Sequence, residues 1–289
     1  SASGALWAAA DAMRRMGLIK VTKESKRVPA KTMVIGATGS IGSVSARLLA
    51  MAFDEVVIAG RDLKKLEELK ASMLEDTPDA HIVCSTNYDE LLGDMDMIVT
   101  STSGAGKKIL DIMKVKPGCV ITDVARPLDL PPEEVAKRPD VLVIESGEIE
   151  LPTKVRGMKS IGLPNNVIYA CLAETIVLAL EGRFEVFTIG RDTEWEKVKE
   201  IYRLGLKHGM KLSAISGANG VYSDEDIARV VKLAKKALPT WKGGSAASKA
   251  PAKRKPAAKK AAATTPAVKA AAKKAPAKKA APARKAAKA

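Results

Sequence analysis

The sequence predicts an α/β protein built around a parallel sheet, and two observations carry this prediction. Short apolar runs alternate along the chain with segments of helical periodicity, which is typical of strands joined by crossover helices. The first run, Thr32–Ile35, leads into a glycine-rich turn and a helical segment, Val44–Met51, and a second β-rich run follows at Glu55–Ala59. Together these segments form a strand, turn, helix and strand in the order of a βαβ unit.

The glycine turn indicates dinucleotide binding. Gly36 allows a sharp turn off the strand, Gly39 allows the backbone to approach a pyrophosphate, and Gly42 allows the helix to pack tightly on the sheet. Phosphates then bind the free N–H groups at the start of the helix. A purely structural glycine turn is the alternative. The predicted nucleotide-binding residues of this turn are Gly36, Thr38, Gly39, Ser40, Ile41 and Gly42.

The residue at the tip of the second strand indicates which dinucleotide is bound. An acidic residue usually holds the ribose 2′-hydroxyl of NAD at this place, but here the tip carries Arg61. A guanidinium can bind a 2′-phosphate with two hydrogen bonds, and Lys64 or Lys65 can add a second positive charge. We therefore predict NADPH as the cofactor. In the alternative, Arg61 is a solvated loop residue and Asp62 reaches the ribose.

The remaining apolar runs complete the predicted fold, a Rossmann-type doubly wound parallel sheet with additional C-terminal helices. Further strands are expected at His81–Ser85, Met95–Ser101, Cys119–Val124 and Val141–Glu145. Helices are expected at Ala5–Met16, Leu63–Leu74, Lys107–Met113, Val167–Leu180, Glu194–His208 and Ser223–Leu238, with a short turn opened by Pro131 and Pro132. Pro164-Asn-Asn is the expected start signal of the helix over 167–180.

Composition divides the chain. Residues 242–289 hold fifteen Lys or Arg and no acid, so the whole net charge of +15 lies there and the preceding part is neutral. This tail is rich in Ala, Lys and Pro, resembles the tails of linker histones and histone-like bacterial proteins, and is expected to be disordered. It is suited to nonspecific binding of nucleic acid or another polyanion; a solubilising extension is the alternative. We expect residues 32–241 to form the nucleotide-binding domain and residues 1–31 to be the remnant of a preceding region.

The sequence does not predict a membrane span, a disulfide framework, a metal site or a nucleophile elbow. The longest apolar run, Val167–Leu180, contains Glu174 and is too short to span a bilayer. Three cysteines do not suggest a disulfide framework, and we expect a cytoplasmic location. His81 and His208 have no ligand-spaced partners, so no metal site is predicted. No nucleophile elbow is present.

The three cysteines differ in their expected positions. Cys84 falls inside a strand and reads as a core residue. Cys119 opens its strand and therefore lies at the amino edge of the sheet, whereas ligands of such folds bind beyond the carboxyl edge. Cys171 lies early in the helix that follows the last predicted strand, where the helix dipole favours a thiolate. From the residues alone it is either a nucleophile or a core cysteine.

Four segments, Gly36–Ser43, Tyr169–Glu174, Leu180–Gly182 and Lys207–Gly209, resemble in order and spacing the long-chain fatty acyl-[acyl carrier protein] reductases of cyanobacteria. The similarity covers about Ala2 to Leu212, and the run Tyr-Ala-Cys-Leu-Ala-Glu around Cys171 is its most specific part. The resemblance implies that Cys171 takes the acyl group of an acyl carrier protein or acyl-CoA as a thioester and that NADPH reduces it to an aldehyde. Members of that family carry a substantial region before the nucleotide-binding part.

Other residues and other functions stay open. Glu174 is either a partner of the Cys171 thiol or a helix residue paired elsewhere. The hydroxyls of Ser101–Gly104 are either cofactor contacts, with Ser101 the first candidate, or loop caps. One alternative function is a shikimate-, quinate- or amino-acid-type dehydrogenase without a covalent intermediate. Another is a non-catalytic nucleotide-binding module tethered to nucleic acid by the basic tail.

Overall fold

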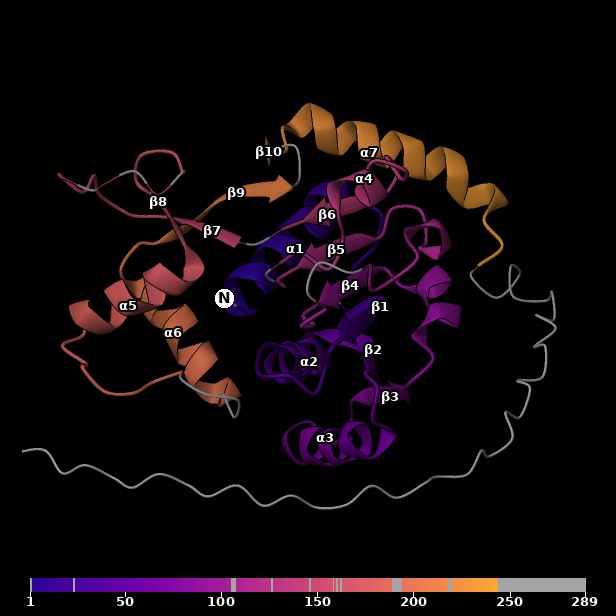
Figure 1. Ribbon diagram of the computed structural model, residues 1–289, viewed down its shortest axis with the longest axis horizontal. Coiled ribbons are helices and arrows are strands. Elements are labelled where there is room, and N and C mark those ends of the chain that lie inside the picture. The colour runs from indigo at the N-terminus through magenta and orange to yellow at the C-terminus, as the bar shows by residue number, and fades with distance from the viewer. Residues whose placement is uncertain are drawn as a thin grey trace, which may run out of the picture. The chain divides into compact units, whose positions relative to one another are not determined.

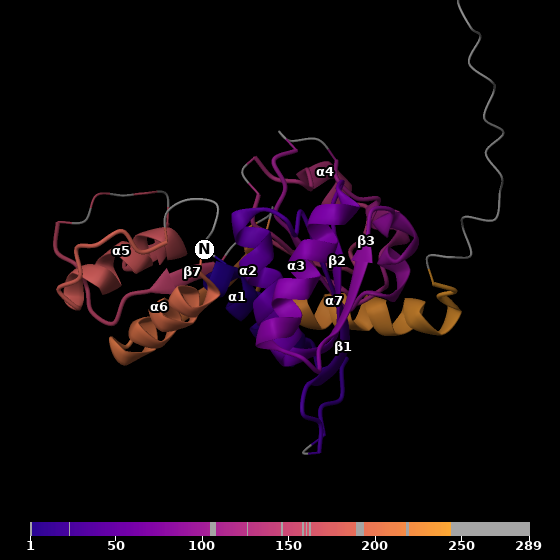
Figure 2. The same ribbon diagram turned by 90° about the horizontal axis from the view of Figure 1, so that it is seen from below.

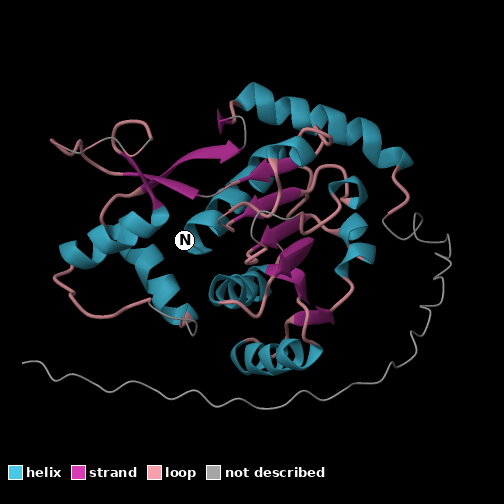
Figure 3. Cartoon of the chain, in the orientation of Figure 1, coloured by secondary structure: helices cyan, strands magenta, loops and turns pink. Residues whose placement is uncertain are grey.

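A six-stranded parallel sheet forms the centre of the part of the chain that the structure, a computed structural model, describes (Figures 1 and 3). The described residues are 2–22, 24–104, 108–125, 127–145, 147–157, 159, 161, 163–188, 194–217 and 220–243. The strand order is β3-β2-β1-β4-β5-β6, which reverses direction after β1 as in a doubly wound sheet. The predicted fold class is confirmed. The strands are β1 (Val28–Ile35), β2 (Phe53–Ala59), β3 (His81–Ser85), β4 (Met97–Thr100), β5 (Val120–Asp123) and β6 (Leu142–Ile144).

Helices cover one face of this sheet. They are α1 (Ala2–Met16), α2 (Ser40–Ala52), α3 (Leu63–Asp76) and α7 (Asp224–Ala237). Strand residues such as Val34, Ile58 and Val99 join helix residues such as Leu49 and Leu66 in one buried cluster. The alternate strand residues point to the other face, where a second cluster packs under 3₁₀ turns and loops. Because both faces are buried, the strands are apolar throughout rather than alternating.

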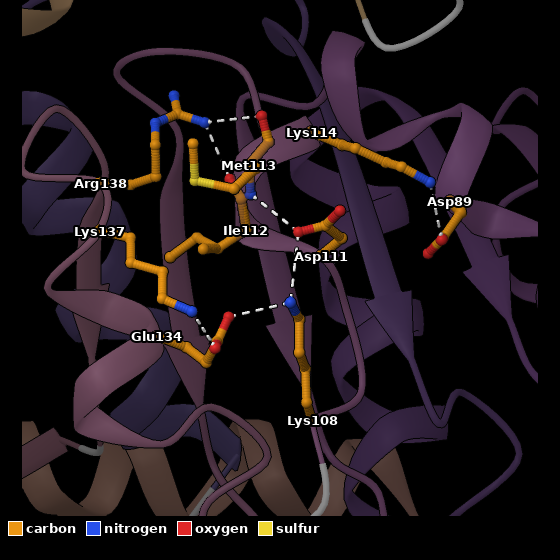
Figure 4. A network of polar contacts seen from close by, with 9 residues as sticks. All are labelled: Asp89, Lys108, Asp111, Ile112, Met113, Lys114, Glu134, Lys137 and Arg138. Carbon is orange, nitrogen blue, oxygen red and sulfur yellow. Dashed lines mark hydrogen bonds and ion pairs between the residues drawn. The ribbon is translucent and has the colours of Figure 1, made fainter. Parts of the chain in front are cut away.

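The segment between β4 and β5 differs from the prediction. An α-helix expected at Lys107–Met113 is wrong: Lys107 lies outside the described residues, and the following chain ends in a 3₁₀ turn, Ile112–Lys114. Figure 4 shows contacts that hold this turn. The buried guanidinium of Arg138 donates to the carbonyls of Ile112 (2.8 Å) and Met113 (3.2 Å), and also to that of Val115 (2.8 Å). The Ile112 carbonyl also accepts the 3₁₀ hydrogen bond from the Val115 N–H (3.2 Å), so the Arg138 contacts hold the chain in this single turn.

Charged side chains fix the rest of this segment. Lys108 forms ion pairs with Asp111 (3.3 Å) and Glu134 (2.9 Å), and Lys114 pairs with Asp89 (3.0 Å) (Figure 4). Glu134 belongs to α4 (Pro132–Val135), the short helical turn that the two prolines predicted. Exposed pairs of this kind stabilise little individually, so the buried Arg138 contacts define the conformation.

A second, antiparallel sheet was not predicted. It has the order β10-β9-β7-β8 and consists of β7 (Gly147–Glu150), β8 (Val167–Tyr169), β9 (Lys211–Gly217) and β10 (Gly220–Val221). With α5 (Ala170–Leu180) and α6 (Trp195–Lys207) it forms a lobe beside the parallel sheet (Figures 1 and 2). We call β7 to β9, α5 and α6 the α5–α6 lobe. Its buried core includes Ile149, Ile168, Val177 and Met210.

The expected helix over 167–180 is therefore corrected at its start. Val167–Tyr169 pairs with β7, and the helix begins at Ala170. The Pro164-Asn-Asn signal marks a turn instead, in which Asn166 has φ 73° and its side chain donates to the Leu151 carbonyl (2.6 Å). A non-glycine residue in the left-handed region cannot continue a helix.

The N-terminal helix α1 packs against both the lobe and the parallel sheet. Helix α1 contacts β5 on one side and β7 and β9 on the other, with Ala8, Ala9 and Ala12 fully buried. Helix α7 begins at a capping box in which the hydroxyl of Ser223 accepts from the N–H of Asp226 (3.1 Å) and the Asp226 carboxylate accepts from the N–H of Ser223 (3.0 Å).

The basic tail, 242–289, lies outside the described residues from position 244 onward, and its predicted disorder stays a prediction. Among the described helices, none combines the length and the apolar character needed to cross a bilayer. The cytoplasmic location stays a prediction as well.

Candidate functional site

The glycine turn joins β1 to α2 with a geometry that side chains would not permit. Gly36 has φ +83°, and a Cβ atom there would lie 2.7 Å from the carbonyl oxygen of Ser101. A Cβ atom on Gly42 would lie 2.2 Å from the Gly36 oxygen. Gly36 therefore permits the turn and its approach to β4, and Gly42 permits α2 to pack against the turn.

The start of α2 is free of competing groups. Its N-cap is Gly39, no side chain caps the helix, and no acid lies in the first turn. The N–H groups of this turn, including those of Ser40 and Ile41, have no intrahelical partner. Together with the helix dipole they suit a phosphate group. The close backbone packing and the uncapped helix start thus fit a dinucleotide at this edge of the sheet.

At the tip of β2, the two residues that could bind the ribose, Arg61 and Asp62, differ in their contacts. Arg61 is exposed and has no side-chain hydrogen bond or ion pair among the described residues. Asp62 is the N-cap of α3, where its carboxylate accepts from the N–H of Lys65 (3.3 Å). Lys64 faces Glu68 on the helix surface (3.9 Å). The guanidinium is thus available to a ligand, whereas the carboxylate already has a structural role.

The hydroxyl groups of Ser101 and Thr102, which follow β4, form hydrogen bonds that fix neighbouring loops. Ser101 donates to the Ile35 carbonyl (3.2 Å), which fastens the ends of β4 and β1. Thr102 bonds Asp129 through its hydroxyl and its N–H, the latter at 2.9 Å. Ser101 therefore has the loop-capping contact that the sequence left open, and its contact with a cofactor stays a prediction.

A cavity of about 750 Å³ connects the start of α2 with the α5–α6 lobe. Ser40, Ile41 and Val44 of α2 line one side, and Cys171 and Glu174 of α5 line another. The structure thus brings the predicted nucleophile and the predicted nucleotide-binding helix to one cavity. Residues of the segment after α5, which the sequence reasoning missed, complete its wall: Arg183, Phe184, Glu185, Phe187 and Thr188.

Cys171 is the second residue of α5, in the first turn after the N-cap Tyr169. This is nearer to the helix start than the sequence suggested, because Val167–Tyr169 is a strand. No side chain caps this helix and no acid lies in its first turn, so its free N–H groups stabilise negative charge there. Cys171 is also the exposed cysteine of the three.

The other two thiols are unsuited to nucleophilic chemistry. Burial, with a hydrogen bond to Glu67, raises the pKa of Cys84 to about 11. Complete burial raises the pKa of Cys119 still further, and Cys119 packs in the core below the sheet. Because their pKa values are raised, both thiols stay protonated at neutral pH.

Thiol labelling tests this difference. At pH 8 and in native buffer, iodoacetamide should modify Cys171 well before Cys84 and Cys119, which should react at comparable rates only after unfolding. Peptide mass spectrometry over time measures the order. Faster native labelling of Cys84 or Cys119 would contradict the described burial.

The described residues contain no group of three His, Cys, Asp or Glu side chains that could hold a metal ion. His81 pairs with Glu55 (3.2 Å), and His208 bonds Glu181 (2.5 Å). Glu181 also accepts from Lys207 (2.7 Å). The segments Leu180–Gly182 and Lys207–Gly209 therefore meet at the ends of α5 and α6, where they hold the lobe together.

Comparisons with known proteins agree with this architecture. Residues 20–150 match the family model of shikimate / quinate 5-dehydrogenase. The match covers the parallel sheet and ends before α5. With the doubly wound sheet and the glycine turn, it identifies this part of the chain as a Rossmann domain of the NAD(P)-dependent oxidoreductase type.

Two curated proteins are similar over a longer stretch. The aminotransferase PigE of a Serratia species is 32% identical over 178 residues, which cover 61% of this chain and 21% of PigE. The long-chain acyl-[acyl-carrier-protein] reductase of Synechococcus elongatus is 24% identical over 194 residues, which cover 65% of this chain and 54% of the reductase. The chain thus spans about a fifth and about half of the lengths of these relatives.

Among solved structures, quinate dehydrogenase from Corynebacterium glutamicum in complex with NAD has 15% identity and a TM-score of 0.35, over 47% of this chain and 50% of that one. Shikimate 5-dehydrogenase from Listeria monocytogenes in complex with shikimate and NAD has 14% identity and a TM-score of 0.35, over 48% and 50% of the two chains.

Proposed function

We propose that this protein reduces an acyl thioester, carried by acyl carrier protein or coenzyme A, to an aldehyde with NADPH. The observation that carries the proposal is the shared cavity: Cys171 lines the same space as Ser40 and Ile41 at the nucleotide-binding helix start. A nucleophile and a nicotinamide must meet at one substrate carbon for this chemistry. The resemblance to the Synechococcus reductase supports the same substrate class.

In the proposed reaction, different residues bind the cofactor, carry the acyl group and enclose the acyl chain. The glycine turn and the start of α2 hold the pyrophosphate, and Arg61 holds the 2′-phosphate. Bound NADPH supplies the hydride. Cys171 attacks the acyl carbonyl, the carrier thiol leaves, and the acyl group stays on the Cys171 sulfur as a thioester until it is reduced. Leu178, Phe187 and Val198 provide the cavity with an apolar wall for the acyl chain.

A second candidate is a dehydrogenase of the shikimate or quinate type, which reduces a ketone without a covalent intermediate. The family match to residues 20–150 favours it. That match ends after β7 and before α5, however, so it covers the cofactor domain and not the cysteine side of the cavity. This candidate assigns no role to an exposed cysteine at a helix start.

Product analysis separates the two candidates. The full chain, NADPH and acyl thioesters of graded length should yield the corresponding aldehydes, detected by gas chromatography. Oxidation of shikimate or quinate by NADP⁺, with no aldehyde from any thioester, would favour the second candidate.

Replacement of Arg61 tests the cofactor assignment. Arg61→Ala should weaken NADPH binding by ~1.5–3 kcal/mol, the usual range for a charged hydrogen bond, and should affect NADH little. Isothermal titration with both nucleotides measures the difference, and Arg203→Ala, an exposed arginine of α6 outside the cavity wall, is the matched control. Equal losses for the two nucleotides would contradict the 2′-phosphate assignment.

The basic tail has a separate role in the proposal. Residues 242–289 are proposed to bind nucleic acid or another polyanion without reading sequence. Deleting residues 244–289 should leave the melting temperature and the NADPH affinity nearly unchanged, while removing most salt-dependent binding to DNA. Fluorescence anisotropy at two salt concentrations measures the binding. A large drop in melting temperature would contradict the predicted disorder of the tail.

A further inference from the structure

Glu174 shares the cavity-lining face of α5 with Cys171. The two residues are three positions apart, which places them on one face of a helix. Both line the cavity that reaches the start of α2. Glu174 is half-buried, whereas Cys171 is exposed. A carboxylate thus lies one helical turn from the predicted nucleophile, deeper along the same wall.

The hydrogen bonding of Glu174 differs from that of three glutamates near the ends of α5 and α6. Glu181 is bound by Lys207, Glu185 by Arg183, and Glu194 by Lys197, each in an ion pair. Glu174 has no cationic partner among the described residues, and one of its oxygens, Oε1, accepts a hydrogen bond from the hydroxyl of Thr188. An ion pair therefore does not account for the position of this carboxylate.

The other charged groups of the cavity are already engaged. Arg183 and Glu185 line it as well, but the Arg183 guanidinium bonds Glu185 (2.5 Å) and Glu200 (2.5 Å). Arg183 also stacks on the ring of Phe187 at 4.6 Å. Among the described side chains that line the cavity, Glu174 is thus the carboxylate without a cation, with its Oε2 oxygen free to meet a ligand.

We propose that Glu174 is a second catalytic residue, which carries the proton of the thiol exchange at Cys171; this inference rests on the proposed function. The Glu174 carboxylate takes the proton from the Cys171 thiol as the sulfur attacks the acyl carbon. The new bond joins the Cys171 sulfur to that carbon, and the bond from the carbon to the carrier sulfur breaks. Glu174 then gives the proton to the departing carrier sulfur, so the exchange is neutral and consumes no reductant.

Thr188 is a positioning residue in this account. Its hydroxyl holds Oε1 of Glu174, which leaves the second oxygen, Oε2, for the proton transfer. Thr188 comes from the segment after α5, which closes the cavity wall. Thr188→Val should therefore lower the exchange rate less than removal of the carboxylate does, and Thr188→Ser should restore it.

The test measures acylation of Cys171 without NADPH, which separates thiol exchange from hydride transfer. The probe is decanoyl-CoA, and rapid-quench mass spectrometry follows the acyl adduct. Glu174→Gln should slow acylation about 10²–10⁴-fold, the range for general acid–base catalysis, while acyl-enzyme once formed should be reduced at the wild-type rate when NADPH is added. Glu196→Gln, on the exposed surface of α6 and outside the cavity wall, is the matched control and should acylate at the wild-type rate.

Chemical rescue distinguishes proton transfer from a structural role. Added formate should raise the acylation rate of Glu174→Ala at least tenfold, because a small carboxylate can occupy the vacated space, and it should leave the wild-type rate unchanged. Two results would overturn the role of Glu174 while the proposed function stands, provided that the wild type is acylated. One is an acylation rate of Glu174→Gln equal to that of the wild type, and the other is no effect of formate on Glu174→Ala. Absence of acylation in the wild type would overturn both.

Discussion

Replacing Cys171 by serine should abolish aldehyde formation and leave NADPH binding intact. A hydroxyl at neutral pH is a far poorer nucleophile than a thiolate, so the acyl group would not leave its carrier. The side chain lines the cavity from α5, whereas the glycine turn and Arg61 belong to β1, α2 and the tip of β2. The substitution replaces the sulfur of Cys171 by oxygen and does not alter the residues predicted to bind the cofactor. We expect a loss of at least a thousandfold in aldehyde production.

The other cysteines provide the controls for this experiment. Cys84→Ser and Cys119→Ser should retain aldehyde formation, although Cys119→Ser should lower stability because the position is fully buried in an apolar cluster. Gas chromatography of the product and NADPH titration on the same samples separate chemistry from binding. Aldehyde formation by Cys171→Ser would make the direct dehydrogenase the better account.

Replacing Gly42 by alanine should disrupt the turn between β1 and α2. A Cβ atom at this position would meet the Gly36 oxygen at 2.2 Å and the Ala37 Cα at 2.9 Å. Both are backbone atoms, so relief requires α2 to move away from the sheet. Forced overpacking of this kind costs ~1–3 kcal/mol, and the displaced helix start should lose affinity for both NADPH and NADH.

Two other glycines make the comparison specific. Gly205→Ala, within α6, has only the Met210 sulfur at 3.9 Å nearby and should be neutral or slightly stabilising. Gly39→Ala meets the Gly36 oxygen at 3.3 Å, so it should reduce stability less than Gly42→Ala while still weakening nucleotide binding. Thermal melts and nucleotide titrations of the three proteins test this order. A Gly42→Ala protein as stable as the wild type would contradict the described packing.

The parallel sheet was predictable because its signals are local. Each of its strands is a short apolar run, and His81–Ser85 has the predicted bounds. The glycine turn specifies the first crossover by spacing alone. The segment over 107–113 was mispredicted because its conformation depends on contacts with residues far along the chain. Arg138 binds the carbonyls of Ile112 and Val115, and the Asp129 carbonyl accepts from the N–H of Ile109 (3.3 Å).

The strands of the α5–α6 lobe could not be predicted from local sequence patterns. Val167–Tyr169 and the following helix form one apolar run, and only pairing with β7 divides strand from helix. The strand β7 has only four residues, and β9 (Lys211–Gly217) mixes polar with apolar residues, so their pairing was not visible. Cys171 could be singled out by its position after the parallel strands and by resemblance. Thr188 could not, because a lone threonine in a connecting segment carries no pattern, and its contact with Glu174 arises only in the folded chain.

The covalent role of Cys171 is tested most directly by trapping. The chain of residues 1–289 is incubated with a long-chain acyl thioester in the absence of NADPH, so that an acyl group on the enzyme cannot be reduced. Peptide mass spectrometry should then find a single acyl adduct on Cys171, which disappears with release of aldehyde when NADPH is added. An adduct on Cys84 or Cys119, or NADPH-dependent turnover with no adduct on Cys171, would contradict the proposed mechanism.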